Sequence, residues 1–184
     1  MKKFRIVAVL AALGVCAVWV PAAVAQDKAA VKRGLYLVTL GGCNDCHSPK
    51  LMTPQGPQPD SARLLSGHPA NVQVAPIAPG TLSPEKWIAM TNGDFTAWAG
   101  PWGISFAANL TPDKATGLGG WTAEQFIQST RTGKHLGVGR PILPPMPIAS
   151  LATLTDADLK AIFAYLKSIK PISNQVPPSV PPGK

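Results

Sequence analysis

The segment Cys43-Asn44-Asp45-Cys46-His47 has the clearest capacity for chemistry in this sequence. Two thiols separated by two residues, with an imidazole directly after the second, can hold a covalent heme, contribute to a zinc site or act as a redox-active dithiol. The chain has three cysteines, and the third, Cys16, lies in an apolar N-terminal stretch. The chemistry of the mature chain is therefore expected to depend on Cys43 and Cys46.

Two of these three chemistries lack supporting features in the sequence. A thiol-disulfide oxidoreductase places its first cysteine at a helix N-terminus beside a sheet, and no pattern of that kind is present. Zinc needs a fourth ligand, and His68 and His135 lack the paired spacing of a zinc finger. In Cys-x-x-Cys-His the two thiols reach the vinyl groups of one porphyrin and the histidine reaches the iron. We therefore expect one covalent heme c on Cys43 and Cys46, with His47 as an axial ligand.

An electron-transferring heme also needs a second axial ligand. The candidates are Met52, Met90, Met146, His68 and His135. Met146 stands between prolines in the sequence Pro-Pro-Met-Pro, and these prolines restrict the backbone that would present its thioether. Met52 follows the first ligand too closely, Met90 is expected inside a helix and His68 in a loop. We expect Met146 to be the ligand, with His135 as the alternative.

The N-terminal residues predict an export signal over residues 1–25. Three cations within the first five residues precede the apolar run 6–20, and Ala23-Val24-Ala25 has the small-x-small spacing of a cleavage site. We expect a periplasmic or exported protein cut after Ala25, with an uncleaved membrane anchor as the alternative. Because three of the cations behind the formal net charge of +8 lie in this signal, the charge does not indicate a nucleic-acid partner.

Four short helices are predicted around the cysteine segment. The first carries Val31, Leu35 and Val38 on one face and stops at the glycines 41–42. The second is predicted over 83–93, since a serine cap followed by proline opens it and a glycine closes it. No strand is predicted.

The other two helices begin at recognisable caps. Thr122 and Gln125 have the spacing of a capping box, and Gly133 stands where that helix should end. Thr155 opens the last helix, which runs until Pro171. These elements suit an all-α fold with long loops rich in proline and glycine.

The domain boundaries follow from composition. Residues 26–172 are expected to form one domain, and within it the proline-rich segment 48–82 is a long loop. The proline-rich tail 173–184 is expected to be disordered.

Several motifs together resemble the class I cytochrome c domain. They are Gly34-Leu35-Tyr36-Leu37, the Cys-x-x-Cys-His segment, Pro145-Met146-Pro147 and residues 154–159. The segments 109–113, 116–121 and 131–133 resemble the subgroup found as monoheme carriers and as modules of cytochrome subunits in periplasmic or membrane-bound dehydrogenases. The resemblance implies an all-α, cytochrome c-like fold, with His47 and Met146 as iron ligands. It also implies that the first and last helices cross near Gly34, against Phe163 or Tyr165.

The expected function is that of a single-electron carrier and not of an enzyme. Its partners would be a dehydrogenase as donor and an oxidase or another cytochrome as acceptor. Two alternatives remain: an electron-transfer subunit inside a dehydrogenase complex, and a heme protein with an open site that acts as a peroxidase-like enzyme or sensor. Asn109, Trp121 and Arg131 are candidates for a place near the heme propionates, although Arg131 equally suits a helix C-terminus and Trp121 suits packing at a helix start.

Overall fold

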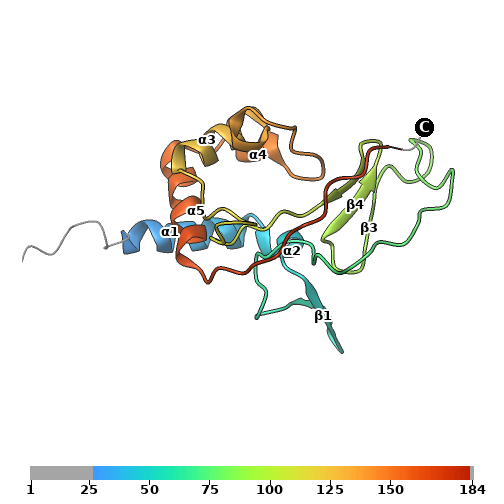
Figure 1. Ribbon diagram of the computed structural model, residues 1–184, viewed down its shortest axis with the longest axis horizontal. Coiled ribbons are helices and arrows are strands. Elements are labelled where there is room, and N and C mark those ends of the chain that lie inside the picture. The colour runs from blue at the N-terminus through green and yellow to red at the C-terminus, as the bar shows by residue number, and fades with distance from the viewer. Residues whose placement is uncertain (1–26, 183–184) are drawn as a thin grey trace, which may run out of the picture.

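The computed structural model describes residues 27–182 of the chain. The helices are α1 (Lys28–Leu40), α2 (Cys43–His47), α3 (Ala123–Thr132), the 3-10 helix η1 (His135–Gly137), α4 (Ile148–Leu151) and α5 (Asp156–Ser168). Figure 1 shows α1, α3 and α5 together at one end of the molecule and the strands β3 and β4 at the other, with α2 between the two ends. No helix within 27–182 is long and apolar enough to cross a membrane.

The first and last helices cross at Gly34, as the resemblance implied. Gly34 is buried in α1, and a Cβ placed there would overlap the carbonyl oxygen of Ala161 and lie 2.7 Å from the Cβ of Tyr165. The close approach is therefore to Ala161 and Tyr165 and not to Phe163. Because Gly34 takes the central position of the buried face, the predicted core residue Leu35 points outward and is 46% exposed.

The hydrophobic core lies between the three longer helices, α1, α3 and α5. Its buried members are Leu37, Val38, Leu65, Leu118, Ile127, Leu159, Ile162, Phe163 and Leu166. Two of them, Leu65 and Leu118, come from irregular segments and not from helices. The core therefore fixes parts of the loops as well as the helices.

The predicted caps are confirmed. Thr122 accepts a hydrogen bond from the amide of Gln125, whose side chain bonds back to Thr122, and Gly133 ends α3 in the left-handed conformation with φ 65°. Thr155 accepts from the amide of Asp158 at the start of α5. Each cap satisfies backbone groups that the helix itself leaves without partners.

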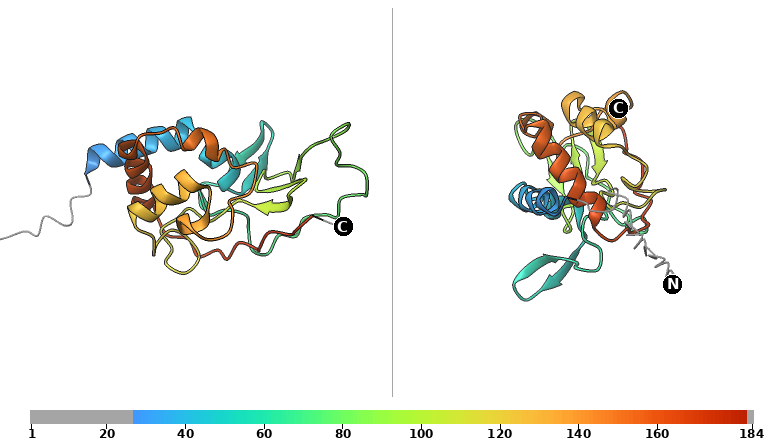
Figure 2. Two further views of the ribbon diagram at one scale, coloured as in Figure 1. Left: turned by 90° about the horizontal axis from the view of Figure 1, so that it is seen from above. Right: turned by 90° about the vertical axis from the view of Figure 1, so that its left-hand side faces the viewer.

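Five short strands occupy the region where none was predicted. They are β1 (Lys50–Thr53) paired with β2 (Gly56–Pro59), and β3 (Met90–Thr91), β4 (Ala97–Gly100) and β5 (Gly103–Phe106) in a second antiparallel sheet. Figures 1 and 2 show the β1–β2 hairpin projecting from the body of the molecule. The structure thus mixes helices with small sheets, which the all-α expectation did not include.

The helix predicted over 83–93 is wrong. This segment forms a turn in which the amide of Ser83 bonds to the carbonyl of Trp87, and Met90 then pairs with Ala99 of β4. The serine-proline signal is local, whereas the hydrogen bonds of Met90 and Thr91 come from a strand several residues later. Met90 is therefore a strand residue and not a helical one.

The C-terminal segment 173–182, where the sequence predicts disorder, makes hydrogen bonds to the rest of the domain. Asn174 donates from its side-chain amide to the carbonyls of Ser66, at 2.7 Å, and His68, at 2.9 Å. Val180 pairs with Ile104 of β5 through two backbone hydrogen bonds. Prolines favour an extended chain, and this extended chain lies along the domain from α5 to the second sheet (Figure 1). The predicted signal, residues 1–25, lies outside the described residues.

Candidate functional site

Two glycines separate α1 from the one-turn helix that carries the cysteines. The amides of Gly41 and Gly42 donate to the carbonyls of Leu37 and Thr39 at the end of α1. Gly42 has φ 61°, the left-handed region that favours glycine, and α2 begins directly after it. This turn places Cys43 against the hydrophobic core.

Both cysteines of α2 are free thiols and half-buried. Burial raises the pKa of Cys43 above its usual 9.0, and burial followed by the nearby charge of Asp45 raises that of Cys46. A redox-active dithiol requires the opposite, a thiol whose pKa is depressed. The electrostatics of α2 therefore disfavour the thiol-disulfide oxidoreductase alternative.

His47 is buried, with 8% of its surface exposed, and its ring is fixed by a backbone carbonyl. Its Nδ1 lies 2.8 Å from the carbonyl oxygen of Ala108. A carbonyl oxygen only accepts, so the proton is on Nδ1 and the Nε2 lone pair is free. Every fully buried polar side-chain atom within 27–182 has a partner. Within the same residues no hydrogen bond of Nε2 is found, so this nitrogen is not fully buried and keeps some accessible surface.

This geometry fits a c-type heme. Iron needs a neutral imidazole that presents one nitrogen and donates from the other, and a carbonyl partner fixes that tautomer. Burial also lowers the pKa of His47, which keeps the ring neutral. The two thiols stand one and four residues before His47 on the same helical turn. The residues present are therefore those that would bind a porphyrin and its iron.

Polar contacts brace the C-terminal end of α2. The hydroxyl of Ser48, which is completely buried, donates to Asn44 Oδ1 and accepts from the amide of Leu65, both at 2.8 Å. Lys50 directs its ammonium group to the carbonyls of Asn44, Asp45 and Ser48. A cation at a helix C-terminus is favourable because it meets the carbonyls that lack helical partners. Sequence reasoning did not single out Ser48 or Lys50.

Met146 lies half-buried in the connection between η1 and α4. Hydrogen bonds attach the residues around it to strand β5 and to the end of α3. The hydroxyl of Ser105 on β5 donates to the carbonyl of Pro144 at 2.6 Å, and the amide of Ile142 donates to the carbonyl of Gly133 at 2.7 Å. The amide of Ile148 then bonds to the carbonyl of Met146 at the start of α4. The segment is thus attached to both the sheet and the helical end.

The other candidate ligands have different environments. His68 is completely buried, and its two ring nitrogens are engaged by Thr96 Oγ1 at 2.8 Å and by the carbonyl of Val72 at 3.0 Å. It therefore has no free nitrogen for zinc or for iron. His135 is exposed on η1, with its ring packed edge-on against Trp121 at 5.0 Å between centroids. Met52 is 75% exposed on the projecting hairpin.

Two of the three residues considered for the propionates, Asn109 and Arg131, have structural partners. Asn109 donates to the carbonyl of Ile172 at 2.8 Å and accepts from the amide and hydroxyl of Thr111. It thereby attaches the C-terminal segment to the domain. Arg131, in the last turn of α3, donates to the carbonyls of Ala152 and Leu154, which lie between α4 and α5. Arg131 thus has the contacts of a helix-terminal cation.

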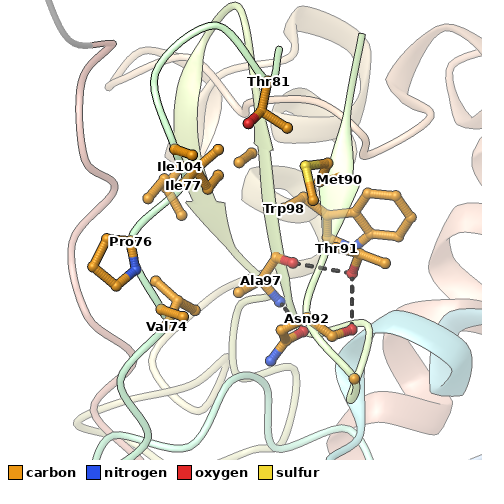
Figure 3. Close-up of a pocket in the computed structure, with 14 residues that line it drawn as sticks. Val74, Pro76, Ile77, Thr81, Met90, Thr91, Asn92, Ala97, Trp98 and Ile104 are labelled. Atoms are coloured by element: carbon orange, nitrogen blue, oxygen red, sulfur yellow. Dashed lines mark hydrogen bonds between the residues drawn. The ribbon is translucent and has the colours of Figure 1, made fainter. Parts of the chain in front are cut away.

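A cavity of about 410 Å³ lies between residues 74–81 and the sheet β3–β5. Figure 3 shows its apolar lining, which includes Val74, Pro76, Ile77 and Ile104, and the hydrogen bond from Thr91 to the carbonyl of Ala97. The side-chain oxygen of Asn92 accepts from two backbone amides, so it too is satisfied within the protein. The predicted heme residues do not line this cavity.

The chain is similar in sequence to cytochrome subunits of dehydrogenases. The gluconate 2-dehydrogenase cytochrome c subunit of Pantoea cypripedii is 31% identical over 156 residues, which is 83% of this chain and 27% of that protein. The cytochrome c subunit of alcohol dehydrogenase (quinone) of Gluconobacter oxydans is 30% identical over 168 residues, 90% of this chain and 27% of that protein. The fructose dehydrogenase cytochrome subunit of Gluconobacter japonicus is 35% identical over 82 residues, 44% of this chain and 17% of that protein.

These matches confirm the resemblance to cytochrome c subunits of dehydrogenases that the motifs indicated. The chain spans about a quarter of the length of the first two relatives. No protein-family model matches it.

Proposed function

We propose that this chain binds one heme c through Cys43 and Cys46, with His47 and Met146 as axial ligands, and passes single electrons. The observation that carries the proposal is the state of His47, which is buried, donates from a protonated Nδ1 to the Ala108 carbonyl and keeps Nε2 free. The heme supplies the one-electron redox chemistry when it is bound. The chain would attach it through Cys43 and Cys46 and orient the imidazole of His47.

Methionine as the second ligand would set the redox properties. A histidine-methionine pair favours ferrous iron and raises the reduction potential relative to two histidines. A filled sixth position would also keep small molecules such as carbon monoxide off the iron. Support for Met146 comes from its sequence context and from its bracing by Ser105 through Pro144.

We also propose that the chain serves as an electron-transfer subunit for a dehydrogenase. The relatives named as cytochrome subunits of gluconate, alcohol and fructose dehydrogenases support this role over that of a freely diffusing carrier, and over catalysis. The donor would then be a catalytic subunit, and the acceptor an oxidase or another cytochrome. Purification from native membranes tests the assignment, because a subunit should co-purify with a dehydrogenase and a free carrier should not.

Covalent heme attachment tests the core of the proposal. The full chain should be produced in a bacterial host that attaches heme outside the cytoplasm, and then stained for heme after denaturing electrophoresis. We expect the wild-type band to stain and to contain one heme per chain by the pyridine hemochrome spectrum. The Cys43→Ala/Cys46→Ala double variant should not stain. A colourless wild-type protein from such a host would overturn the proposal.

A further inference from the structure

Gly67 contacts two carbonyl groups near His47: that of His47 itself and that of Ala108. Its amide donates to the backbone carbonyl of His47 at 2.7 Å. Its φ is 80°, in the left-handed region, and it lies in the buried segment 65–69. Gly67 therefore holds the backbone of His47 from within a buried, conformationally restricted segment.

The α-carbon of Gly67 packs against the carbonyl to which the His47 ring donates. A Cβ on Gly67 would lie 2.5 Å from the oxygen of Ala107, 2.7 Å from the carbonyl carbon of Ala108 and 2.8 Å from its oxygen. Such separations are below van der Waals contact, so any side chain here must displace the backbone of Ala107 and Ala108 or the segment that carries Gly67. Ala108 O is the atom 2.8 Å from His47 Nδ1.

The backbone on both sides of Gly67 is held in place. The amide of His68 donates to the carbonyl of Ala107 at 2.9 Å, and the amide of Leu110 donates to the carbonyl of Leu65 at 2.8 Å. On the other side, Asn174 donates to the carbonyls of the two residues that flank Gly67. Gly67 cannot withdraw without breaking several of these bonds, so strain from a side chain would reach the Ala108 carbonyl.

We propose that Gly67 is a positioning residue for the proximal ligand. It allows the Ala108 carbonyl to approach His47 Nδ1, and that hydrogen bond makes the imidazole a more basic donor toward iron through Nε2. Loss of the bond would weaken this donation and favour ferrous over ferric iron. The inference rests on the proposed function, because it assigns Gly67 a role toward the same iron.

The test compares Gly67→Ala with Gly93→Ala in the heme-loaded full chain. Gly93 is a matched control, since nothing lies within 4 Å of a Cβ placed there and its φ is outside the left-handed region. For Gly67→Ala we expect a more positive midpoint potential and faster solvent exchange of the His47 Nδ1 proton, measured by NMR on the reduced protein. Gly93→Ala should match wild type in both measurements. A role in stability alone would speed proton exchange but would leave the potential of the folded protein unchanged, so the potential is the deciding measurement.

The outcomes separate this inference from the proposed function. Wild type without covalent heme would refute the function, whereas heme-loaded wild type with an unaltered Gly67→Ala variant would refute only the role of Gly67. If Gly67→Ala does not fold, amide exchange in wild type decides. The Gly67 amide and the His47 Nδ1 proton should then both exchange slowly. A Gly67 amide that exchanges as fast as those of exposed loops would overturn the inference.

Discussion

The hydroxyl of Ser105 donates a hydrogen bond of 2.6 Å to the carbonyl of Pro144, 39 residues later in the chain. Ser105 lies on β5, and Pro144 belongs to the proline-rich segment that presents Met146. Ser105 also accepts from the indole of Trp102 at 3.2 Å, which orients its hydroxyl. The small sheet is therefore bonded to the segment that carries the proposed second ligand of the iron.

Replacing Ser105 with alanine should loosen the methionine ligand. The Pro144 carbonyl would lose its partner, at a cost of about 1 kcal/mol in the free energy of unfolding. We expect Ser105→Ala to keep its heme and its wild-type spectrum but to bind carbon monoxide faster in the ferrous state, as followed by stopped-flow absorbance. Thr53→Ala is a suitable control, because its hydroxyl bonds only within the β1–β2 hairpin. Equal carbon monoxide rates for Ser105→Ala and wild type would contradict this role of Ser105.

Substitution of the two candidate second ligands should give opposite results. In Met146→Ala we expect loss of the low-spin spectrum and rapid binding of carbon monoxide to ferrous heme, because the sixth position would be open. His135→Ala should behave like wild type, since His135 is exposed and packs on Trp121. Optical spectra of both variants, with and without carbon monoxide, make the comparison. Rapid binding by wild type itself would instead favour the open-site alternative.

The helices could be predicted because their signals are local. The hydroxyls of Thr122 and Thr155 each accept from the amide three residues later. Both partners of such a cap therefore lie within one helical turn of the sequence. The strands depend on partners that the local sequence does not specify. Met90 pairs with Ala99, and β2 contains two prolines that argue against a strand. An edge position in a two-stranded sheet makes those prolines tolerable.

The candidate site likewise has a part that the local sequence predicts and a part that depends on residues distant in the chain. Cys43, Cys46 and His47 lie within five residues of one another, so their motif can be recognised from the sequence alone. The Ala108 carbonyl that orients His47 is 61 residues away. Every residue has a backbone carbonyl, so the residue type does not reveal which one accepts this hydrogen bond. Gly67 did carry a signal, since glycine is suited to a positive φ, but glycines are common in this chain and the sequence does not distinguish this one.

A side chain at the helix crossing should destabilise the protein. In Gly34→Ala the new methyl group would overlap the Ala161 carbonyl, and we expect the free energy of unfolding to fall by about 1–3 kcal/mol, as for other overpacked interiors. Chemical denaturation followed by circular dichroism measures this difference. Gly120→Ala is the control, because only the carbonyl of Lys114, at 3.9 Å, lies near its added methyl. Equal stability of the Gly34→Ala variant and wild type would argue against the crossing.

Arg131 should matter for stability and not for the heme. Its guanidinium donates to the carbonyls of Ala152 and Leu154 and to Asp156, which joins α3 to the α4–α5 connection. We expect Arg131→Ala to lower the free energy of unfolding by about 2 kcal/mol. The optical spectrum and the midpoint potential should stay at their wild-type values. Arg140→Ala, which removes an exposed arginine with one long contact to a carbonyl, should change little. A shifted potential in Arg131→Ala would instead place Arg131 beside the heme.

The ion pair between Arg33 and Asp158 should make part of the stability depend on pH. The Arg33 guanidinium donates to Asp158 at 2.9 Å across the α1–α5 contact, and this bond holds the pKa of Asp158 below its usual 3.8. A carboxylate with a lowered folded-state pKa stabilises the protein above its unfolded-state value. That contribution disappears as the pH falls through the folded-state pKa.

Asp158→Asn should therefore be less stable than wild type near neutral pH, and the difference should shrink as the pH is lowered below about 3.8. Denaturant titrations at a series of pH values measure it, and added salt should reduce it because the pair is partly exposed. Glu85→Gln is the control, an exposed acidic residue for which no ion pair is found within residues 27–182. A difference between Asp158→Asn and wild type that stays constant from neutral to acidic pH would show that Asp158 acts through its hydrogen bonds and helix-terminal position, and not through its charge.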